Sequence, residues 1–356
     1  MSIRAPQQYA FINVKIQAKK SLLLQLTDYD RLVRAQNLDD LGRQLGTTSY
    51  GKLGISQRLA DRDHFPSGLE IDHILTKDFQ DLVSGLAKNL PRNTQPLIGF
   101  FMDRFFLDGL KAVIRGKHNR IPKPELQQFV FSPIPKQNEM LNRLIDSQSI
   151  AQVVDGVTVS KYRVALQKAL PEYDQTASVL SLEQALNNSY FTSMWKEAQK
   201  LRGLSRSATQ LLGAEIDLIN ISIMLRGKSF DLDRETLKRW LIPISYRLGA
   251  LDSYLGLKLS EIISRLQNTR YRDFSEQAAS LFENADNPQL ERIDPLIQQY
   301  LVHQAFSSLR GIPFHLGVFI AFFILKRAEF GNIRAIIVGK LSGLSPEDTK
   351  NNLILW

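Results

Sequence analysis

The chain has 356 residues, of which 44% are hydrophobic and 23% charged, and it carries a formal net charge of +9 without a single cysteine. Such a composition is that of a globular protein, and the length predicts two or three domains. The lack of cysteine excludes disulfides, thiolate metal sites and a cysteine nucleophile.

The amino-terminal third of the sequence sets a pattern of three features. The segment before Tyr50 reads as a helix leading into TTSY, and Leu69-Glu70 opens an apolar helical stretch. A further helix ends at Gly116-Lys117. The following segment, 121–136, has four prolines and predicts a linker. The opening segment lacks the apolar run of a signal peptide.

The same three features return twice in the same order. The tyrosines are Tyr50, Tyr162 and Tyr271, which are almost evenly spaced. The Gly-Lys pairs, with the same even spacing, are Gly116-Lys117, Gly227-Lys228 and Gly339-Lys340. Leu-Glu stands between them at 69, 182 and 290. A nearly constant period of roughly 110 residues predicts three helical domains, over 1–125, 126–240 and 241–356, with the linker at about 121–136.

Each Gly-Lys pair follows an apolar face with the spacing of an α-helix. The faces consist of Leu107, Leu110 and Ile114, of Leu218, Ile221 and Leu225, and of Phe330, Ile333 and Ile337. We expect each glycine to lie just past its helix in the left-handed conformation, and each lysine to suit the negative end of the helix dipole. Strict alternation is rare, so the fold class is all-α.

Two segments complete the third repeat. The apolar stretch 312–325 is shorter than the roughly 20 residues that span a bilayer, so we expect a buried helix there and a soluble or peripheral protein. Ser345 predicts the N-cap of a short final helix that begins at Pro346.

Two of the repeated helices carry a carboxylate and an amide three residues apart. These are Asp217 with Asn220 and Glu329 with Asn332, whereas the first helix has Phe106 and Gly109 at the equivalent positions. Side chains at this spacing share a helix face and can bind each other or a neighbouring helix. We interpret them as structural, with a partner contact as the alternative.

No catalytic pattern emerges from the sequence. Gly227-Lys228-Ser229 resembles the end of a phosphate-binding loop, but Ser222 stands where that motif needs glycine and a helix precedes it. The five histidines form no metal-ligand spacing, and no GxSxG motif is present. We predict no enzyme activity, cofactor, metal or small-molecule substrate. The scattered basic residues predict a solvated surface and no nucleic-acid partner.

The triplication and the carboxyl-terminal motif resemble the family of the C subunit of A/V-type ATPases and the d subunit of V-ATPases. The family's segment reads E-x-x-N-[LI]-R-x-I-x-x-G-K-x-x-G-L, which Glu329, Asn332, Arg334, Gly339 and Lys340 match. The middle copy has Asp217, Asn220, Arg226, Gly227 and Lys228. The first copy lacks the acid and the asparagine and rests on position and TTSY.

The resemblance implies a fold and a function. Three pseudo-repeated helical domains would pack around a pseudo-threefold axis into a funnel. The protein would be a non-catalytic central-stalk subunit of a rotary ATPase, with the central shaft subunits and the membrane proteolipid ring as partners. It would lie at the cytoplasmic face of a prokaryotic plasma membrane and serve ATP synthesis and transport of protons or sodium.

Two other classes remain open at this point. A helical scaffold or adaptor for other partners would have shorter, more numerous repeats of about 20–50 residues, unlike the long period found here. An enzyme would need a polar pocket with clustered acids or histidines.

Overall fold

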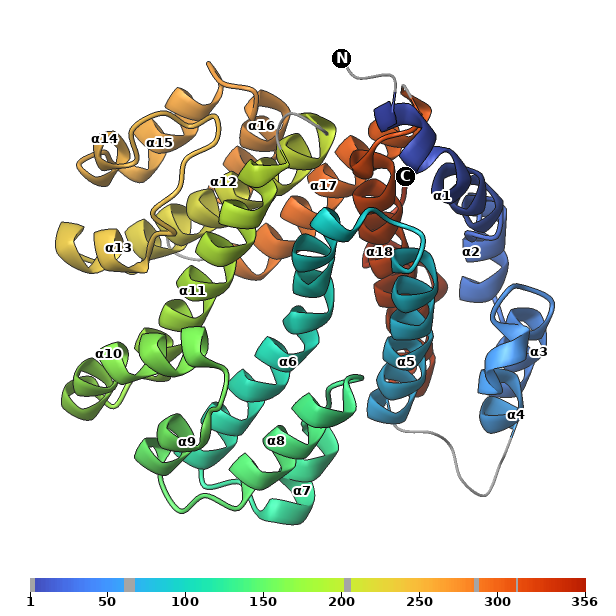
Figure 1. Cartoon of the computed structure of the whole chain (residues 1–356), viewed down its shortest axis with the longest axis horizontal. Helices are drawn as coiled ribbons and strands as arrows, with labels where there is room; N and C mark the ends of the chain where they lie inside the picture. The colour runs from blue at the N-terminus through green and yellow to red at the C-terminus, as the bar shows by residue number, and fades with distance from the viewer. Residues whose placement is uncertain (1–3, 61–67, 202–205, 285–287, 312) are drawn as a thin grey trace. The chain divides into compact units, whose positions relative to one another are not determined.

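A computed structural model describes residues 4–60, 68–201, 206–284, 288–311 and 313–356 (Figure 1). Every regular element in these ranges is a helix, which confirms the all-α prediction. The chain forms two compact units, Met1–Gln95 with Leu301–Trp356, and Pro96–Tyr300. The first unit therefore joins the two ends of the chain. Whether the sequence divides into three domains at 125 and 240 stays a prediction.

The first unit holds five amino-terminal helices and the carboxyl-terminal ones. Its helices are α1 (Arg4–Lys20), α2 (Leu26–Val33), α3 (Leu38–Gly46), α4 (Ile55–Ala60), α5 (Gly68–Ala87), α18 (Leu316–Leu341) and α19 (Pro346–Asn351), with short 3-10 turns at Gly51–Leu53 and Arg92–Thr94. Helix α17 (Ile293–Arg310) contributes its last residues.

The second unit contains the longer run of helices. They are α6 (Gln95–His118), α7 (Lys123–Phe129), α8 (Pro135–Ile145), α9 (Ile150–Gly156), α10 (Ser160–Thr176), α11 (Val179–Lys200), α12 (Arg206–Ser229), α13 (Arg234–Trp240), α14 (Asp252–Leu255), α15 (Leu259–Leu266) and α16 (Arg272–Ser280), with a 3-10 turn at Leu290–Arg292 before α17.

Helix α18 forms the core of the first unit. It packs against α1 and α5, and the Phe79 ring meets that of Phe323 edge-on with 5.3 Å between centroids. Of the apolar residues at its start, 316–325, all but Ile324 are buried, so the expected buried helix is present from Leu316 onward. Ile312, the first residue of the predicted stretch, lies outside the described ranges.

Helix α12 has the equivalent place in the second unit, where it packs against α11 and α13. It is the one helix of the described ranges long and apolar enough to cross a membrane by length and composition. Since 78% of that apolar window is buried, a core helix accounts for it equally well. An ion pair of 2.7 Å joins Arg104 of α6 to Glu215 of α12.

Several local predictions can be checked directly. All nine residues of the three predicted apolar faces are buried, which confirms the helix register. Ser345 caps α19 by accepting a hydrogen bond from the Asp348 amide, as expected. The segment 121–136, expected to be a linker, contains α7 and the first turn of α8. Three of its four prolines, Pro122, Pro124 and Pro135, stand at helix starts, where the missing N–H costs no hydrogen bond.

Candidate functional site

The three repeated glycines do not end their helices, and here the sequence prediction is wrong. Gly116, Gly227 and Gly339 are buried inside α6, α12 and α18, each two residues before the helix end. The left-handed residue comes four positions later in each copy. These residues are Arg120, Asp231 and Gly343, with φ of 56°, 51° and 68°. Each helix then closes with an amide donating to the glycine carbonyl, from Ile121, Leu232 and Leu344 at 2.8–2.9 Å.

The glycines are needed because another side chain lies against them. A Cβ on Gly116 would collide with the Leu126 side chain, and one on Gly227 with Leu237. At Gly339 the colliding side chain is Thr349, in α19. The partner stands ten positions after the glycine in every copy. The repeated glycine is therefore a close-packing position at which the chain folds back over the helix it has just left.

The segment that follows each of these helices crosses the helix a second time, nearer to its amino-terminal end. The Asn220 side chain donates to the carbonyls of Ile242 and Ile244 and accepts from the Ile242 amide, at 2.8–3.0 Å. Asn332 makes the equivalent pair of bonds with the backbone of Ile354, at 2.7 and 2.8 Å. Both partners lie 22 residues after the asparagine. The buried side-chain amide of each asparagine thus supplies hydrogen bonds that the backbone of the returning segment would otherwise lack.

Helix α6 makes the same crossing without a polar side chain. Gly109 stands at the asparagine position, and Phe131, at the same separation along the sequence, passes over it. A Cβ on Gly109 would lie 3.3 Å from the Phe131 carbonyl oxygen and would collide with Leu141. The missing asparagine in the first copy is therefore replaced by close contact.

The acid one turn before the asparagine binds a tyrosine. Asp217 accepts from the amides of Tyr246 and Arg247, at 2.8 and 2.6 Å, and from the Tyr271 hydroxyl at 2.6 Å. Burial raises the pKa of Asp217, while these hydrogen bonds lower it. Burial and the Asp217 charge raise the pKa of Tyr271, so its hydroxyl stays a donor. The two carboxylate oxygens are fully occupied by the chain itself.

Glu329 of α18 binds the amino-terminal segment in the same way. Its carboxylate accepts from the Leu24 amide at 2.5 Å and from the Tyr50 hydroxyl. Lys326, also buried, donates to Glu329 at 2.8 Å and to the Tyr50 hydroxyl at 2.7 Å. The last repeated helix is therefore tied to the beginning of the chain, 279 residues away at Tyr50.

The tyrosine that contacts the first repeated helix, α6, is Tyr162, and its partner is apolar. The Tyr162 ring packs on Phe106 of α6 with centroids 5.9 Å apart, and its buried hydroxyl has no hydrogen-bond partner among the described residues. Tyr162 and Tyr271 thus contact the repeated helix that precedes them in the sequence, and Tyr50 contacts the last repeated helix. In each case the contacted helix belongs to a different copy from the one in which the sequence repeat places the tyrosine.

The remaining repeat residues lie at the ends of these helices. Arg226 pairs with Asp294 at 3.0 Å and donates to the Leu290 carbonyl, and Arg334 pairs with Asp72 at 3.2 Å. Lys228 donates to the Leu255 carbonyl at 2.8 Å. Lys117 and Lys340 occupy the last turns of α6 and α18.

Sequence reasoning missed the partners of these residues. Leu126, Leu237 and Thr349, the crossing segments at Phe131, Ile242 and Ile354, and Lys326 carry no motif of their own. Their constant separations from the repeated glycine and from the asparagine position are the signal that could have found all but Lys326. No group of three or more histidines, aspartates or glutamates in the described part of the chain is placed to hold a metal ion.

Three long helices with the same glycine contact and the same returning segment define a protein built by triplication of a helical module. The model of the family described as ATP synthase (C/AC39) subunit matches residues 12–352. The chain belongs to this family, as its resemblance indicated, and is thereby part of a rotary, membrane-associated ATPase.

Relatives agree over nearly the whole length. The C subunit of the A-type ATP synthase of Methanocaldococcus jannaschii is 24% identical over 352 residues, which cover 97% of this chain and 86% of that protein. The protein of the same name from Haloferax volcanii is 23% identical, and the match covers both chains completely. That from Methanosphaera stadtmanae is 22% identical, with 98% and 88% covered.

Proposed function

We propose that the chain is the non-catalytic central-stalk subunit of an A-type rotary ATPase, where it joins the rotating shaft to the proteolipid ring of the membrane. The observation that carries this proposal is the family match over residues 12–352, with relatives named as C subunits of A-type ATP synthases that cover the chain almost completely. ATP synthesis and the transport of protons or sodium would then be activities of the whole complex.

The polar clusters support a mechanical rather than a chemical role. Asp217 and Glu329 are completely buried, and their carboxylates are occupied by hydrogen bonds from tyrosines and backbone amides. Such groups hold segments together and are not positioned to take a proton from a substrate. A part that transmits torque needs helices that keep their packing under load, and each cluster binds one repeated helix to a distant segment.

The repeat also supports the proposed arrangement of domains. Three modules of about 110 residues, with divisions near 125 and 240, would pack around a pseudo-threefold axis in a funnel that receives the shaft. The contact between Glu329 and Tyr50 gives the last repeated helix the partner that the other two find in the next copy.

The location follows from the same proposal. The chain would lie peripherally at the cytoplasmic face of a prokaryotic plasma membrane, in contact with shaft subunits on one side and the proteolipid ring on the other. Nucleic acid and small-molecule substrates have no part in this function.

The test removes the protein from an otherwise intact complex. We expect the catalytic head to keep hydrolysing ATP while ion pumping into membrane vesicles stops, because the shaft no longer turns the ring. Re-addition of the purified chain should restore pumping. Undiminished pumping without the chain would exclude the connector role, and co-purification with none of the ATPase subunits would favour an adaptor for other partners.

A further inference from the structure

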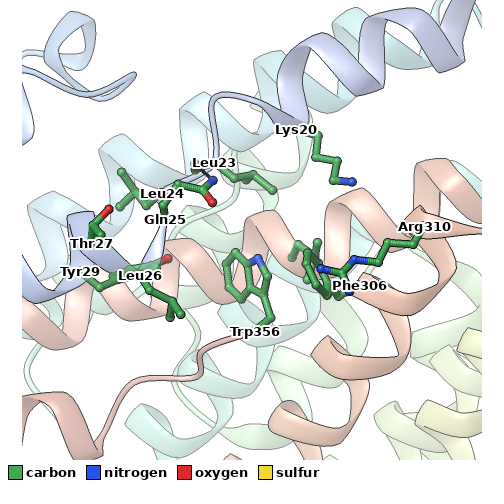
Figure 2. A pocket seen from close by; sticks show the side chains of 11 residues that line it. Lys20, Leu23, Leu24, Gln25, Leu26, Thr27, Tyr29, Phe306, Arg310 and Trp356 are labelled. Atoms are coloured by element: carbon green, nitrogen blue, oxygen red, sulfur yellow. Dashed lines mark hydrogen bonds between the residues drawn. The ribbon is translucent and has the colours of Figure 1, made fainter.

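A cavity in the first unit has a cationic end and an apolar end (Figure 2). It has a volume of about 420 Å³ and lies where the end of α1 and the start of α2 meet residues of α17, α18 and the carboxyl-terminal segment. Figure 2 shows Lys20 and Arg310 on the same side, next to Phe306, and Trp356 between them and the start of α2.

Two positive charges lie close together at this end. The Lys20 ammonium lies 5.9 Å and the Arg310 guanidinium carbon 4.2 Å from the centre of the Phe306 ring. Neither has an ion-pair partner among the residues that the structure describes. A ring that attracts both cations brings two like charges to one place, and that arrangement favours an anion between them.

The two acidic side chains of α2 are already engaged. The first acidic residue of the sequence is Asp28, which pairs with Arg31 at 3.2 Å and accepts from the Gln25 amide. Asp30 pairs with Lys350 at 2.6 Å. Neither carboxylate is therefore available to pair with Lys20 or Arg310.

The other end of the cavity is mainly apolar, with Gln25 and Thr27 among its leucines, and is partly open to solvent. Leu23, Leu24 and Leu325 are buried in its wall. Leu26, which also lines it, is 55% exposed, and the adjacent Leu22 is 50% exposed. Leucines exposed beside a basic cavity gain free energy only if something apolar covers them.

We infer that this cavity binds an anionic phospholipid, with the phosphate between Lys20 and Arg310 and the acyl chains over Leu22 and Leu26. The inference rests on the proposed function, which brings the chain to the membrane surface. Two cations select an anion, and the exposed leucines select one that carries an apolar body. Free phosphate would satisfy the first requirement and leave the leucines in water.

The first experiment measures flotation of the full chain with vesicles. Wild-type protein should float with phosphatidylglycerol vesicles and stay behind with phosphatidylcholine vesicles, and high salt should release it. The double variant Lys20→Gln/Arg310→Gln should bind about 25-fold more weakly, since each basic residue near an anionic surface contributes a factor of about five. The matched control, Arg163→Gln/Lys168→Gln, removes two cations of α10 in the other unit and should change binding less than about twofold.

A second variant and a soluble ligand identify the source of the anion. Leu22→Ser/Leu26→Ser keeps both cations and should also lose flotation. Short-chain phosphatidylglycerol below its micelle concentration should change the fluorescence of Trp356, a signal that Trp356→Phe removes, whereas inorganic phosphate should not. An equal response to inorganic phosphate, or equal binding by the cation variant and its control, would overturn the lipid site.

Different measurements reveal failure of this inference and failure of the proposed function. Vesicle binding is measured on the chain alone, and assembly is measured by co-purification with the other ATPase subunits. A chain that restores ion pumping to the depleted complex but ignores anionic vesicles would end the lipid inference and leave the connector role intact.

Discussion

The returning segment crosses α6, α12 and α18 in the same way, but the side chains that hold it differ between α6 and the other two helices. Over α12 and α18 a buried acid and a buried asparagine bind the returning chain and a tyrosine. Over α6, Phe106 and Gly109 do so by contact alone. The close-packing glycine is common to all three copies, so the fold depends on the close approach, and the polar groups are one way to hold it.

The largest difference in the free energy of unfolding should be found between variants of the two buried acids, Glu329 and Asp217. Glu329→Gln leaves Lys326 buried without its anion, and breaking a buried ion pair costs about 3–5 kcal/mol. Asp217→Asn has no cation to strand and keeps hydrogen-bonding capacity, so we expect a cost of about 1–2 kcal/mol. Denaturant unfolding followed by circular dichroism measures both.

A second substitution tests the reason for that difference. Lys326→Met added to Glu329→Gln should recover much of the loss, because the stranded charge is gone. If the double variant is no more stable than Glu329→Gln alone, the buried ammonium is not the cause.

The three tyrosines offer the sharpest matched comparison. Tyr50→Phe and Tyr271→Phe each remove a hydrogen bond to a buried carboxylate and should cost about 1.5–3 kcal/mol. Tyr50→Phe also removes the hydrogen bond from Lys326, so its cost should be the larger of the two. Tyr162→Phe removes a buried hydroxyl that has no partner in the described structure and should be neutral or slightly stabilising. Equal losses at all three positions would show that the ring contacts, and not the acids, determine the energetics.

Alanine at the repeated glycines should cost a smaller and uniform amount. Gly116→Ala and Gly227→Ala put a methyl group into Leu126 and Leu237, and overpacking of this kind costs about 1–3 kcal/mol. The control is Gly331→Ala on α18, where a Cβ meets nothing within 4 Å, and helix propensity should stabilise it by about 0.5–1 kcal/mol. Tolerance of alanine at Gly116 and Gly227 would contradict the close-packing role.

The smallest effect concerns pH. The folded-state pKa of Asp217 is raised above its ordinary value of 3.8 by burial, so the folded protein holds this proton more tightly than the unfolded chain. The stability it contributes is therefore fully present below the unfolded pKa and is lost as the pH rises through the folded one. Relative to Asp217→Asn, which does not titrate, wild-type protein should lose stability as the pH rises above about 4. A pH-independent difference would mean that the hydrogen bonds balance burial, and a wild-type protein that gains stability as the pH rises would mean that they outweigh it.

The sequence by itself determined the helices and their inward faces. Leu218, Ile221 and Leu225 recur with helical spacing, and a period of 3.6 residues is a local property that needs no knowledge of the fold. The family was also determined, because the motif from Glu329 to Lys340 is continuous in the chain. The N-cap at Ser345 depends on four consecutive residues, so the sequence predicted it as well.

Only the tertiary structure decided what the repeated residues do. A glycine near a helix end suits a left-handed turn and a close contact equally well, since the lack of a Cβ favours both, and only the position of Leu237 separates the two roles for Gly227. Tyr162 stands between two repeated helices in the sequence, and its packing on the earlier one follows from long-range contacts that no local pattern encodes. The hydrogen bond between Tyr50 and Glu329 joins residues near the two ends of the chain. The free energy of such a contact depends on the distance in space, which no local sequence pattern gives.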